Sequence, residues 1–316
     1  MSGAVGQAPR VAVVGSLHFD IMVRAPYLPR TGETLMGSSW WWKPGGKGGN
    51  QAMAAARQGA AVEMIGCLGD DEFGVRLRAR LAAAGVGLAH LRTVPQGSGM
   101  SVAIQQDSGD YAAVVVSGAN RAIDEAQIDA AGAAIGSCRV LLLQNEIAEA
   151  ANAAAARLAR SAGAGVMLNA APARPPGRLA GLVDILVVNA IEAEMLGAAP
   201  VQDLAGAAAA ARKLLALAPT VIVTAGAHGV ASASGPASVA VPAQAVARAE
   251  THGAGDVFAG ALAARLAAAA PLEAALRYAA SAATLHVGTP EEGRAAIGPT
   301  DVQRLIADPD ARLRKL

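Results

Sequence analysis

Short apolar runs rich in β-branched residues recur along the chain, and each has the length of a buried strand. Alanine-rich segments of helical length lie between most of them. Strands that alternate with helices in this way predict a parallel sheet covered by helices on both faces. We therefore expect an α/β protein with a Rossmann-like, doubly wound, mainly parallel sheet. The expected strands are VAVVG (11–15), VEMIGC (62–67), RVLLLQ (139–144), GVMLN (165–169), DILVVN (184–189) and TVIVTAG (220–226), and the expected helices span 49–59, 71–84, 124–136, 147–162 and 203–218.

Two regions break this alternation. Residues 18–42 and 99–117 have the β-rich pattern of hairpin strands, and the second contains the turn sequence DSGD. We expect them to pair as a small β-sheet lid that stands off the main sheet. After residue 250 the pattern is helical, with two helices separated by Pro271. Because no stretch has the character of an interdomain linker, the chain is expected to form a single domain, 1–316, with the lid strands inserted in it.

Composition narrows the range of partners. The 316 residues are 53% hydrophobic and 16% charged, which is enough apolar content for a large core. With a formal net charge of +1, neither nucleic acid nor a membrane is an expected partner, and a small molecule is favoured. Cys67 and Cys138 are far apart in sequence, as expected for buried thiols in a reducing compartment. The first residues lack the apolar core of a signal peptide, so a cytoplasmic protein is expected.

Polar residues that follow the strands are the first candidates for a site, because ligands of doubly wound sheets bind beyond the carboxyl ends of the strands. The most informative stretch is THGAGD (251–256), which opens a long helix. Gly253, Ala254 and Gly255 would offer backbone N–H groups to an anion at the helix N-terminus. Asp256 beside them is either a helix-start carboxylate or a base that deprotonates the attacking hydroxyl in a phosphoryl transfer.

The stretch KPGGKGGNQ (43–51) suggests a phosphate-binding loop, because it combines glycines with lysine. It fails that pattern, since Gly48 follows Lys47 where Ser or Thr is required. Its glycines are better explained as letting the backbone approach a ligand closely, with Lys47 and Asn50 as donors to hydroxyl groups.

Four motifs occur in one order along the chain: GSLHFD (15–20), PGGKGGNQA (44–52), NAIEAE (189–194) and GAGD (253–256). Together they resemble the ordered signatures of the ribokinase-like carbohydrate kinases of the phosphofructokinase-B type. The resemblance implies the ribokinase-like fold and an ATP-dependent transfer of the γ-phosphate to a sugar hydroxyl. Because GSLHFD, PGGKGGNQA and LLLQNEI look most like the ribose kinases of this family, D-ribose is the favoured acceptor and D-ribose 5-phosphate the product.

The resemblance also implies roles for individual residues. Asp256 would be the catalytic base, with the N–H groups of Gly253, Ala254 and Gly255 as the anion hole. Glu192 would hold Mg²⁺ through water, and Glu250 a monovalent cation such as K⁺. Relatives often dimerise through the lid, so a homodimer is expected. The residues implied at the sugar are His18, Asp20, Gly46, Lys47, Asn50, Glu146 and Asp256, and those implied at the nucleotide are Asn189, Glu192, Thr224, Gly226, Gly229 and Gly255.

Several of these residues have an ordinary structural alternative. Asp20 could be a solvated hairpin residue, and Glu146 could be an acid that favours the start of the following helix. Asn189 and Glu192 could be a helix cap and its first-turn acid. Thr224 could simply end its strand.

The chain also departs from the family pattern. His18 stands where asparagine usually faces the sugar, Glu250 stands where aspartate is usual, and residues 287–299 read VGTPEEGRAAIGP where the family usually carries a basic residue and a short glycine turn. Acceptor identity and K⁺ activation are therefore left open. A nucleoside or ketohexose kinase of the same family is one rival, and a non-catalytic sugar-binding relative is another. An NAD-dependent enzyme is disfavoured, because no G-x-G-x-x-G follows the first strand.

All three tryptophans of the chain directly precede the glycine-rich loop. On a strand, Trp40 and Trp42 should face one side and Trp41 the other. One side could cover the sugar, stack on a base or contact a partner lid, and packing within the small sheet is the equal alternative.

Overall fold

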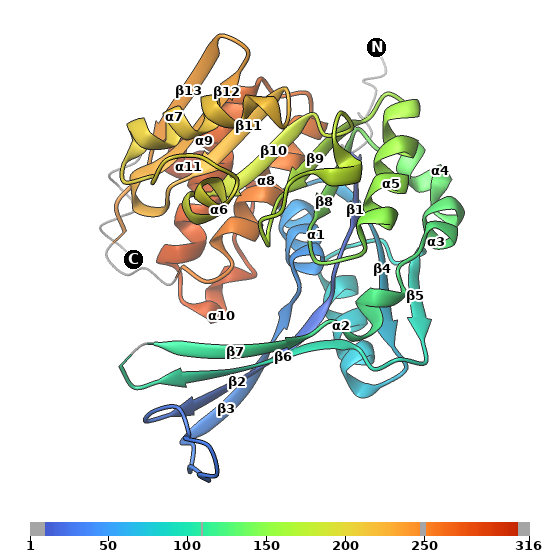
Figure 1. The fold of residues 1–316 in the computed structure, drawn as a ribbon, viewed down its shortest axis with the longest axis vertical. Helices are drawn as coiled ribbons and strands as arrows, with labels where there is room; N and C mark the ends of the chain where they lie inside the picture. Colours follow the sequence, from blue (N-terminus) through green and yellow to red (C-terminus); the bar gives the residue numbers. More distant parts are fainter. Residues whose placement is uncertain (1–9, 109, 247–250, 309–316) are drawn as a thin grey trace.

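The main sheet is the α/β, mainly parallel sheet that the sequence predicts. A computed structural model describes residues 10–108, 110–246 and 251–308. Its strands in this sheet are β1 (Arg10–Val14), β4 (Ala61–Gly69), β5 (Leu91–Val94), β8 (Val140–Gln144), β9 (Gly165–Asn169), β10 (Ile185–Asn189), β11 (Thr220–Thr224), β12 (Gly229–Ser234) and β13 (Ala237–Pro242). Within the described residues they lie in the order β13-β12-β11-β10-β9-β8-β1-β4-β5 (Figure 1). Pairing is parallel from β5 to β11, and β12 and β13 add an antiparallel edge.

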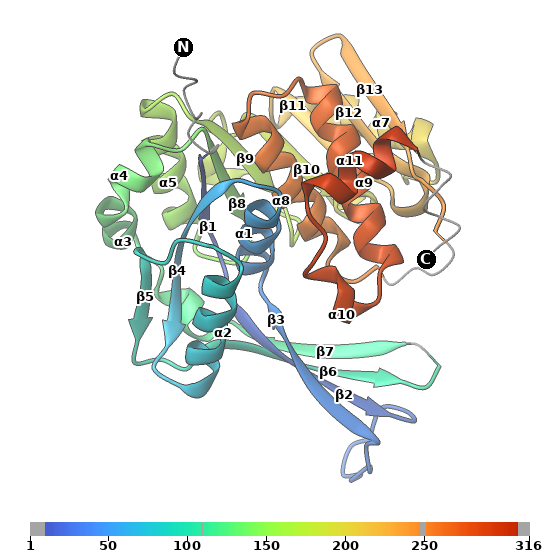
Figure 2. The ribbon, with the colours of Figure 1, turned by 180° about the vertical axis from the view of Figure 1, so that it is seen from behind.

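Helices cover both faces of this sheet (Figures 1 and 2). They are α1 (Lys47–Arg57), α2 (Glu72–Ala83), α3 (Glu125–Ala130), α4 (Gly132–Gly136), α5 (Glu149–Ser161), α6 (Ala190–Met195), α7 (Leu204–Lys213), α8 (Ala254–Ala267), α9 (Leu272–Gly288), α10 (Glu291–Arg294) and α11 (Pro299–Ala307). Among the helices of the described ranges, none has both the length and the apolarity that a membrane span needs.

The side chains of the main sheet contribute to two separate apolar cores, one on each face, because successive residues of a strand point to opposite faces. On β1, Ala12 and Val14 pack in the core shared with α3, α4, α5 and α7. Val11 and Val13 pack in the other core, shared with α1, α2, α8, α9 and α11. The core between α1, α8 and the sheet is the one that lies beneath the predicted site.

A second sheet of four strands, called the small sheet below, extends away from the main sheet (Figure 1). Its strands are β2 (His18–Ala25), β3 (Ser39–Gly45), β6 (Gly99–Gln106) and β7 (Tyr111–Val116), in the order β3-β2-β6-β7. They fall in the two regions predicted for the lid, except that β3 continues to Gly45. Only residues 15–17 separate β1 from β2, so β1, which lies between β8 and β4 in the main sheet, leads directly into the small sheet.

One face of the small sheet is apolar over most of its length, with Gln106, paired with Ala25, as a polar residue at its far end. Paired residues on neighbouring strands share a face, so the register of the four strands defines its members. This apolar face consists of Phe19, Ile21, Val23, Trp40, Trp42, Met100, Val102, Ile104, Ala112, Val114 and Val116. The opposite face carries His18 and Asp20.

The tryptophans alternate as predicted, with Trp40 and Trp42 on the apolar face and Trp41 on the opposite one. Trp42 stacks on Phe19 with ring centroids 4.5 Å apart, and Phe19 stacks on Phe73 of α2 at 4.2 Å. Trp42 therefore packs within the protein. Through Phe19, it joins the root of the small sheet, the end nearest the main sheet, to α2. Trp40, further from the root, is 68% exposed.

Some elements differ from the predicted ones. The segment 229–242 forms β12 and β13, although it is rich in alanine and serine, which rarely favour strands. Pairing with β11 and burial of Ala231 and Ala233 outweigh that weak propensity. The helix predicted over 124–136 is divided at Ala131 into α3 and α4, and α6 was not predicted as a helix of its own.

Candidate active site

The end of β1 and the start of α1 meet backbone against backbone. A Cβ on Gly48 would lie 2.6 Å from the carbonyl carbon of Gly15, and a Cβ on Gly46 would lie 2.7 Å from the amide nitrogen of His18. Gly46 also has a φ of 80°, in the left-handed region that glycine adopts without strain. The glycines of this loop were predicted to admit a ligand, but the close approach they permit in the structure is to the chain's own residues 15–18.

Glu146 joins three segments at this contact. Its Oε2 accepts a hydrogen bond from the backbone N–H of Lys47 at 2.9 Å and another from the hydroxyl of Ser16. Helix α5 begins only at Glu149, with Ala148 as its N-cap, so Glu146 lies outside the first turn of that helix. The carboxylate is thus bonded to the start of α1.

Asp256 lies in the first turn of α8 and faces α1. Its Oδ1 accepts a hydrogen bond from Gln51 Nε2 at 2.9 Å, and its Oδ2 accepts one from Asn50 Nδ2 at 3.1 Å. Burial raises the pKa of Asp256 above its ordinary value; the Lys47 ammonium and the two amide donors oppose that shift, and the Glu146 carboxylate adds to it. The side chain remains partly exposed, so a ligand can reach it.

The N-terminus of α8 has the backbone form expected of an anion site. Gly253 is its N-cap with a φ of 80°, and no side chain of the described residues caps the helix. Gly255 is exposed. Of the three predicted donors, the N–H of Ala254 already donates to the carbonyl oxygen of Thr251 at 3.2 Å, a long bond that an incoming anion would have to share or replace.

Asp20 and His18 lie at the root of the small sheet. Asp20 Oδ1 accepts a hydrogen bond from the Ser101 hydroxyl at 2.6 Å, so this carboxylate is held in place. A Cβ on Gly45 would lie 2.0 Å from Asp20 Oδ2, which shows that the carboxylate rests against the end of β3. His18 is only 5% exposed, and its Nε2 has no hydrogen-bond partner among the described residues.

Asn189 and Glu192 form a capping box at the start of α6. Asn189 Oδ1 accepts from the Glu192 N–H and Glu192 Oε2 accepts from the Asn189 N–H, both at 2.8 Å. Burial raises the pKa of Glu192; the Asn189 N–H and the Lys47 ammonium oppose this, and the Asp256 carboxylate adds to it. Thr224 pairs with Asn189 across β10 and β11, so both residues lie at the same edge of the sheet.

The predicted nucleotide loop follows β11. Gly226 and Gly229 have φ values of 53° and 114°, and a Cβ on Gly229 would lie 2.2 Å from the carbonyl oxygen of Val241. These glycines are required by the turn into β12. Glu250, expected at a monovalent cation, lies outside the described residues. In the part of the chain that the structure describes, no three His, Cys, Asp or Glu side chains are grouped as a metal site.

Comparison with known proteins decides the family. The pattern of the pfkB family carbohydrate kinases matches residues 8–296. The chain belongs to this family. Ribokinase of Bacillus subtilis (strain 168) is 37% identical over 279 residues, which cover 88% of this chain and 92% of the relative. Deoxyribokinase of Salmonella typhi is 32% identical over 273 residues, covering 85% and 89%. A solved structure of Arabidopsis thaliana ribokinase, complexed with ribose and ATP, superposes with a TM-score of 0.88 at 30% identity, covering 95% of this chain and 99% of that one.

In this pfkB kinase, sequence analysis missed three amide side chains beneath Asp256. Gln51 Oε1 accepts a hydrogen bond from Gln144 Nε2 at 2.8 Å, and Gln51 Nε2 donates to Asn169 Oδ1 at 2.9 Å as well as to Asp256. The signal was present, because Gln144 and Asn169 are each the single polar residue at the end of an apolar strand.

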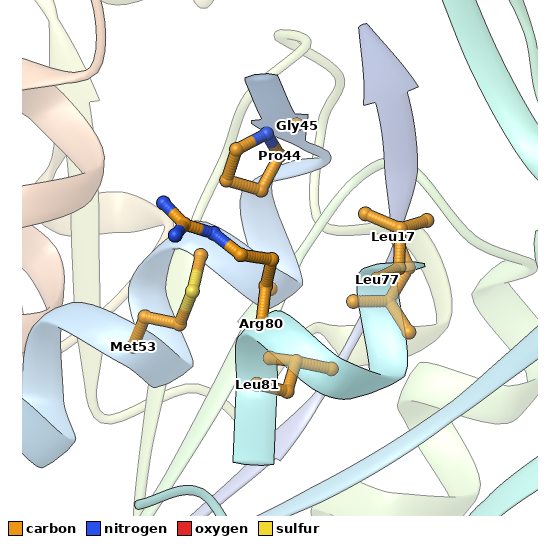
Figure 3. Close-up of a pocket in the computed structure, with 8 residues that line it drawn as sticks. Leu17, Pro44, Gly45, Met53, Leu77, Arg80 and Leu81 are labelled. Carbon is orange, nitrogen blue, oxygen red and sulfur yellow. The ribbon is translucent and has the colours of Figure 1, made fainter. Parts of the chain in front are cut away.

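A recess behind the loop is a packing gap in the pfkB fold. It lies between α1, α2 and the end of β3 (Figure 3), and it has no room for a water molecule. A sugar cannot occupy it. Its lining residues are Leu17, Pro44, Gly45, Gly49, Met53, Leu77, Arg80 and Leu81.

The close contact at Gly15 can be tested by adding one methyl group. A Cβ there would lie 1.9 Å from Gln144 Oε1 and 2.9 Å from the Cα of Gly48. We expect Gly15→Ala to lower the free energy of unfolding by about 1–3 kcal/mol, measured by urea denaturation, and to reduce kinase activity. Gly132→Ala is the control, because a Cβ at Gly132 in α4 would point into open space. Equal stability of the two variants would contradict the close contact.

Proposed function

We propose that this pfkB carbohydrate kinase transfers the γ-phosphate of ATP to the 5-hydroxyl of D-ribose. The observation that carries the proposal is Asp256, a carboxylate at the uncapped N-terminus of α8, partly exposed and hydrogen-bonded to α1. The similarity to ribokinases, one of them solved with ribose and ATP, supports this choice of acceptor and nucleotide.

Asp256 acts as the general base in this reaction. It takes the proton of the acceptor hydroxyl as the hydroxyl oxygen forms a bond to the γ-phosphorus, and the bond to the bridging oxygen breaks so that ADP leaves. The raised pKa of Asp256 strengthens it as a base, while Lys47 and the amide donors favour its ionised form. Backbone N–H groups of Gly253, Ala254 and Gly255 stabilise the charge on the transferring phosphoryl group.

The sugar is held between the small sheet and α1. Asp20, already oriented by Ser101, accepts from sugar hydroxyls, and the unpaired Nε2 of His18 offers a further hydrogen-bonding position. Asn50 and Lys47 donate from the start of α1. Gly46 and Glu146 shape the same wall of the site.

The nucleotide lies along the ends of β10 and β11. Asn189, Thr224, Gly226 and Gly229 are placed for its phosphates and ribose, with Gly255 next to the γ-phosphate. Mg²⁺ would neutralise the triphosphate when bound. Glu192, a partly exposed carboxylate at the start of α6, would hold the ion through water, and an oxygen ligand of this kind suits Mg²⁺. K⁺ activation through Glu250 and a cytoplasmic location remain predictions from the sequence.

A homodimer through the small sheet is supported by its apolar face. Beyond the part covered by α2, Trp40, Val114 and Val116 of this face are 68%, 71% and 51% exposed. Large contiguous apolar patches on a folded protein mark interaction sites. A second copy of the same face would bury these side chains.

The role of Asp256 is tested by Asp256→Asn, which keeps the shape of the side chain and removes the base. We expect kcat to fall by about 10²–10⁴-fold while the affinity for D-ribose, measured by calorimetry, changes little. Asp203→Asn is the control, because Asp203 is also a helix-start carboxylate, capping α7 through the Gly206 N–H at 2.6 Å. Because Asn caps a helix about as well as Asp, Asp203→Asn should change stability by less than about 1 kcal/mol and leave kcat unchanged. Near-full activity of Asp256→Asn would rule out the assigned base.

The acceptor is tested by steady-state kinetics with ATP and Mg²⁺ against D-ribose, 2-deoxy-D-ribose, fructose and several nucleosides. We expect D-ribose to have the highest kcat/KM. His18→Asn, which installs the usual residue of the family, should change kcat/KM for D-ribose about tenfold, the size of one hydrogen bond, and leave KM for ATP unchanged. If only a nucleoside is phosphorylated, D-ribose is not the acceptor, although the proposed phosphoryl transfer from ATP still holds.

The dimer is tested by placing a charge on either face of β7. Val114→Lys puts an ammonium on the apolar face, and Val115→Lys puts one on the opposite face at a comparably exposed neighbour. By light scattering after size exclusion, we expect the wild type and Val115→Lys to have the mass of two chains and Val114→Lys that of one. A monomeric wild type, or dissociation of Val115→Lys alone, would contradict the proposed interface.

A further inference from the structure

Gln51 is buried beneath Asp256, and both the nitrogen and the oxygen of its side-chain amide form hydrogen bonds. Its exposed fraction is 0%. Nε2 donates to Asp256 Oδ1 and to Asn169 Oδ1, both at 2.9 Å, and Oε1 accepts from Gln144 Nε2 at 2.8 Å. A primary amide has two N–H donors, so both are used here, one of them on the proposed base.

The neighbours of Gln51 fix which way its amide faces. Asn169 Nδ2 donates to the carbonyl oxygen of Val187 in β10 at 3.2 Å, so Asn169 must present its oxygen to Gln51. A rotated Gln51 amide would place its oxygen against two acceptors, Asn169 Oδ1 and Asp256 Oδ1, and its nitrogen against the donor of Gln144. The hydrogen bonds of Asn169 inside the sheet therefore fix the orientation of the Gln51 amide, with an N–H group towards Asp256.

The backbone of Gln51 is fixed relative to α8 as well. A Cβ on Gly260 would lie 2.5 Å from the carbonyl oxygen of Gln51, so α8 crosses α1 at this point with no side chain between them. Asp256 lies one turn before Gly260 on α8. The distance between the amide and the carboxylate is thus held by the crossing of the two helices.

Gln51 differs from Asn50 in its access to ligands. Asn50 is partly exposed and, in the proposed function, donates to the sugar. Gln51 has no exposed surface and cannot touch sugar or nucleotide. We propose that Gln51 is a positioning residue, which holds Oδ1 of Asp256 through a permanent amide donor and leaves Oδ2 to receive the proton of the acceptor. This proposal rests on the proposed role of Asp256 as the base.

The donor also bears on the ionisation of Asp256. Burial raises the pKa of this carboxyl, and hydrogen bonds from Gln51 and Asn50 lower it because they favour the charged form. The other charged or titratable groups around it are Lys47 of α1, Glu146 after β8 and Glu192 of α6. His286 of α9 lies beyond Gly253, bonded to the carbonyl oxygen of His252 at 2.9 Å. Replacement of Gln51 alone leaves all of these charged or titratable groups in the protein.

The test is Gln51→Met, which keeps the length of the side chain and removes the donor. We expect kcat to fall about 10–100-fold, with KM for D-ribose and ATP changed less than about threefold. Loss of a bond to the ionised form raises the pKa of Asp256, so the acid limb of the kcat profile should move to higher pH by about one unit. If Gln51→Met does not fold, Gln51→Asn carries the same expectation, because its amide is one methylene too short to reach Asp256.

Gln127→Met is the matched control for the loss of a buried glutamine. Gln127 is 7% exposed, and its Nε2 donates to the carbonyl oxygens of Gly66 and His90 at 2.7 and 3.1 Å, remote from Asp256 in the fold. We expect it to lower Tm by an amount similar to that of Gln51→Met, with the acid limb in its wild-type position.

The possible results distinguish the positioning role of Gln51 from the proposed role of Asp256 as the base. If the acid limb of the kcat profile is unchanged in Gln51→Met while Asp256→Asn is inactive, Gln51 is not a positioning residue. Asp256 would then still be the base. An active Asp256→Asn would instead overturn the base, and the positioning role with it. A shift of the acid limb in Gln51→Met that is absent in Gln127→Met establishes the positioning role.

Discussion

The candidate site depends on how closely α1 can approach its neighbours on two sides. On one side Gly48 meets Gly15 at the end of β1, and on the other Gly260 of α8 meets the backbone of Gln51. Each contact is shorter than a Cβ would permit. Because α1 lies between the end of β1 and α8, its first turn reaches both Glu146 and Asp256. The apolar core beneath these contacts holds the arrangement in place.

The charged forms of the site carboxylates are favoured by one ammonium together with several amide donors. Burial raises the pKa of Asp256 and of Glu192; the Glu146 carboxylate adds to the shift of Asp256, and the Asp256 carboxylate adds to the shift of Glu192. Lys47 is the ammonium that opposes both shifts. The remaining opposition comes from amide N–H groups, those of Asn50 and Gln51 on Asp256 and the backbone N–H of Asn189 on Glu192. Amides do this without adding a charge that would itself need a partner.

The sequence predicts the fold well where apolar runs have strong strand propensity, and less well where pairing decides. The parallel strands other than β5 and the two regions that form the small sheet were predicted, while β5, β12 and β13 were not, because they depend on partners that no local pattern reveals. The order of the motifs led to Asp256 and the start of α1. The contact of the loop glycines with residues 15–18 was not predicted, because it joins segments that β2 and β3 separate along the chain. Gln51 and its amide partners escaped notice because their bonds join residues about a hundred or more positions apart.

The hydrogen bonds between α1 and Asp256 join residues 205 and 206 positions apart in the chain. During synthesis, α1 leaves the ribosome long before α8, and the side of α1 that packs on α8 stays uncovered until α8 follows. The catalytic arrangement therefore cannot precede the completion of the core. A shortened chain that ends before α8 would expose the apolar side of α1, which makes it a substrate for chaperones and proteases in place of a partly active kinase.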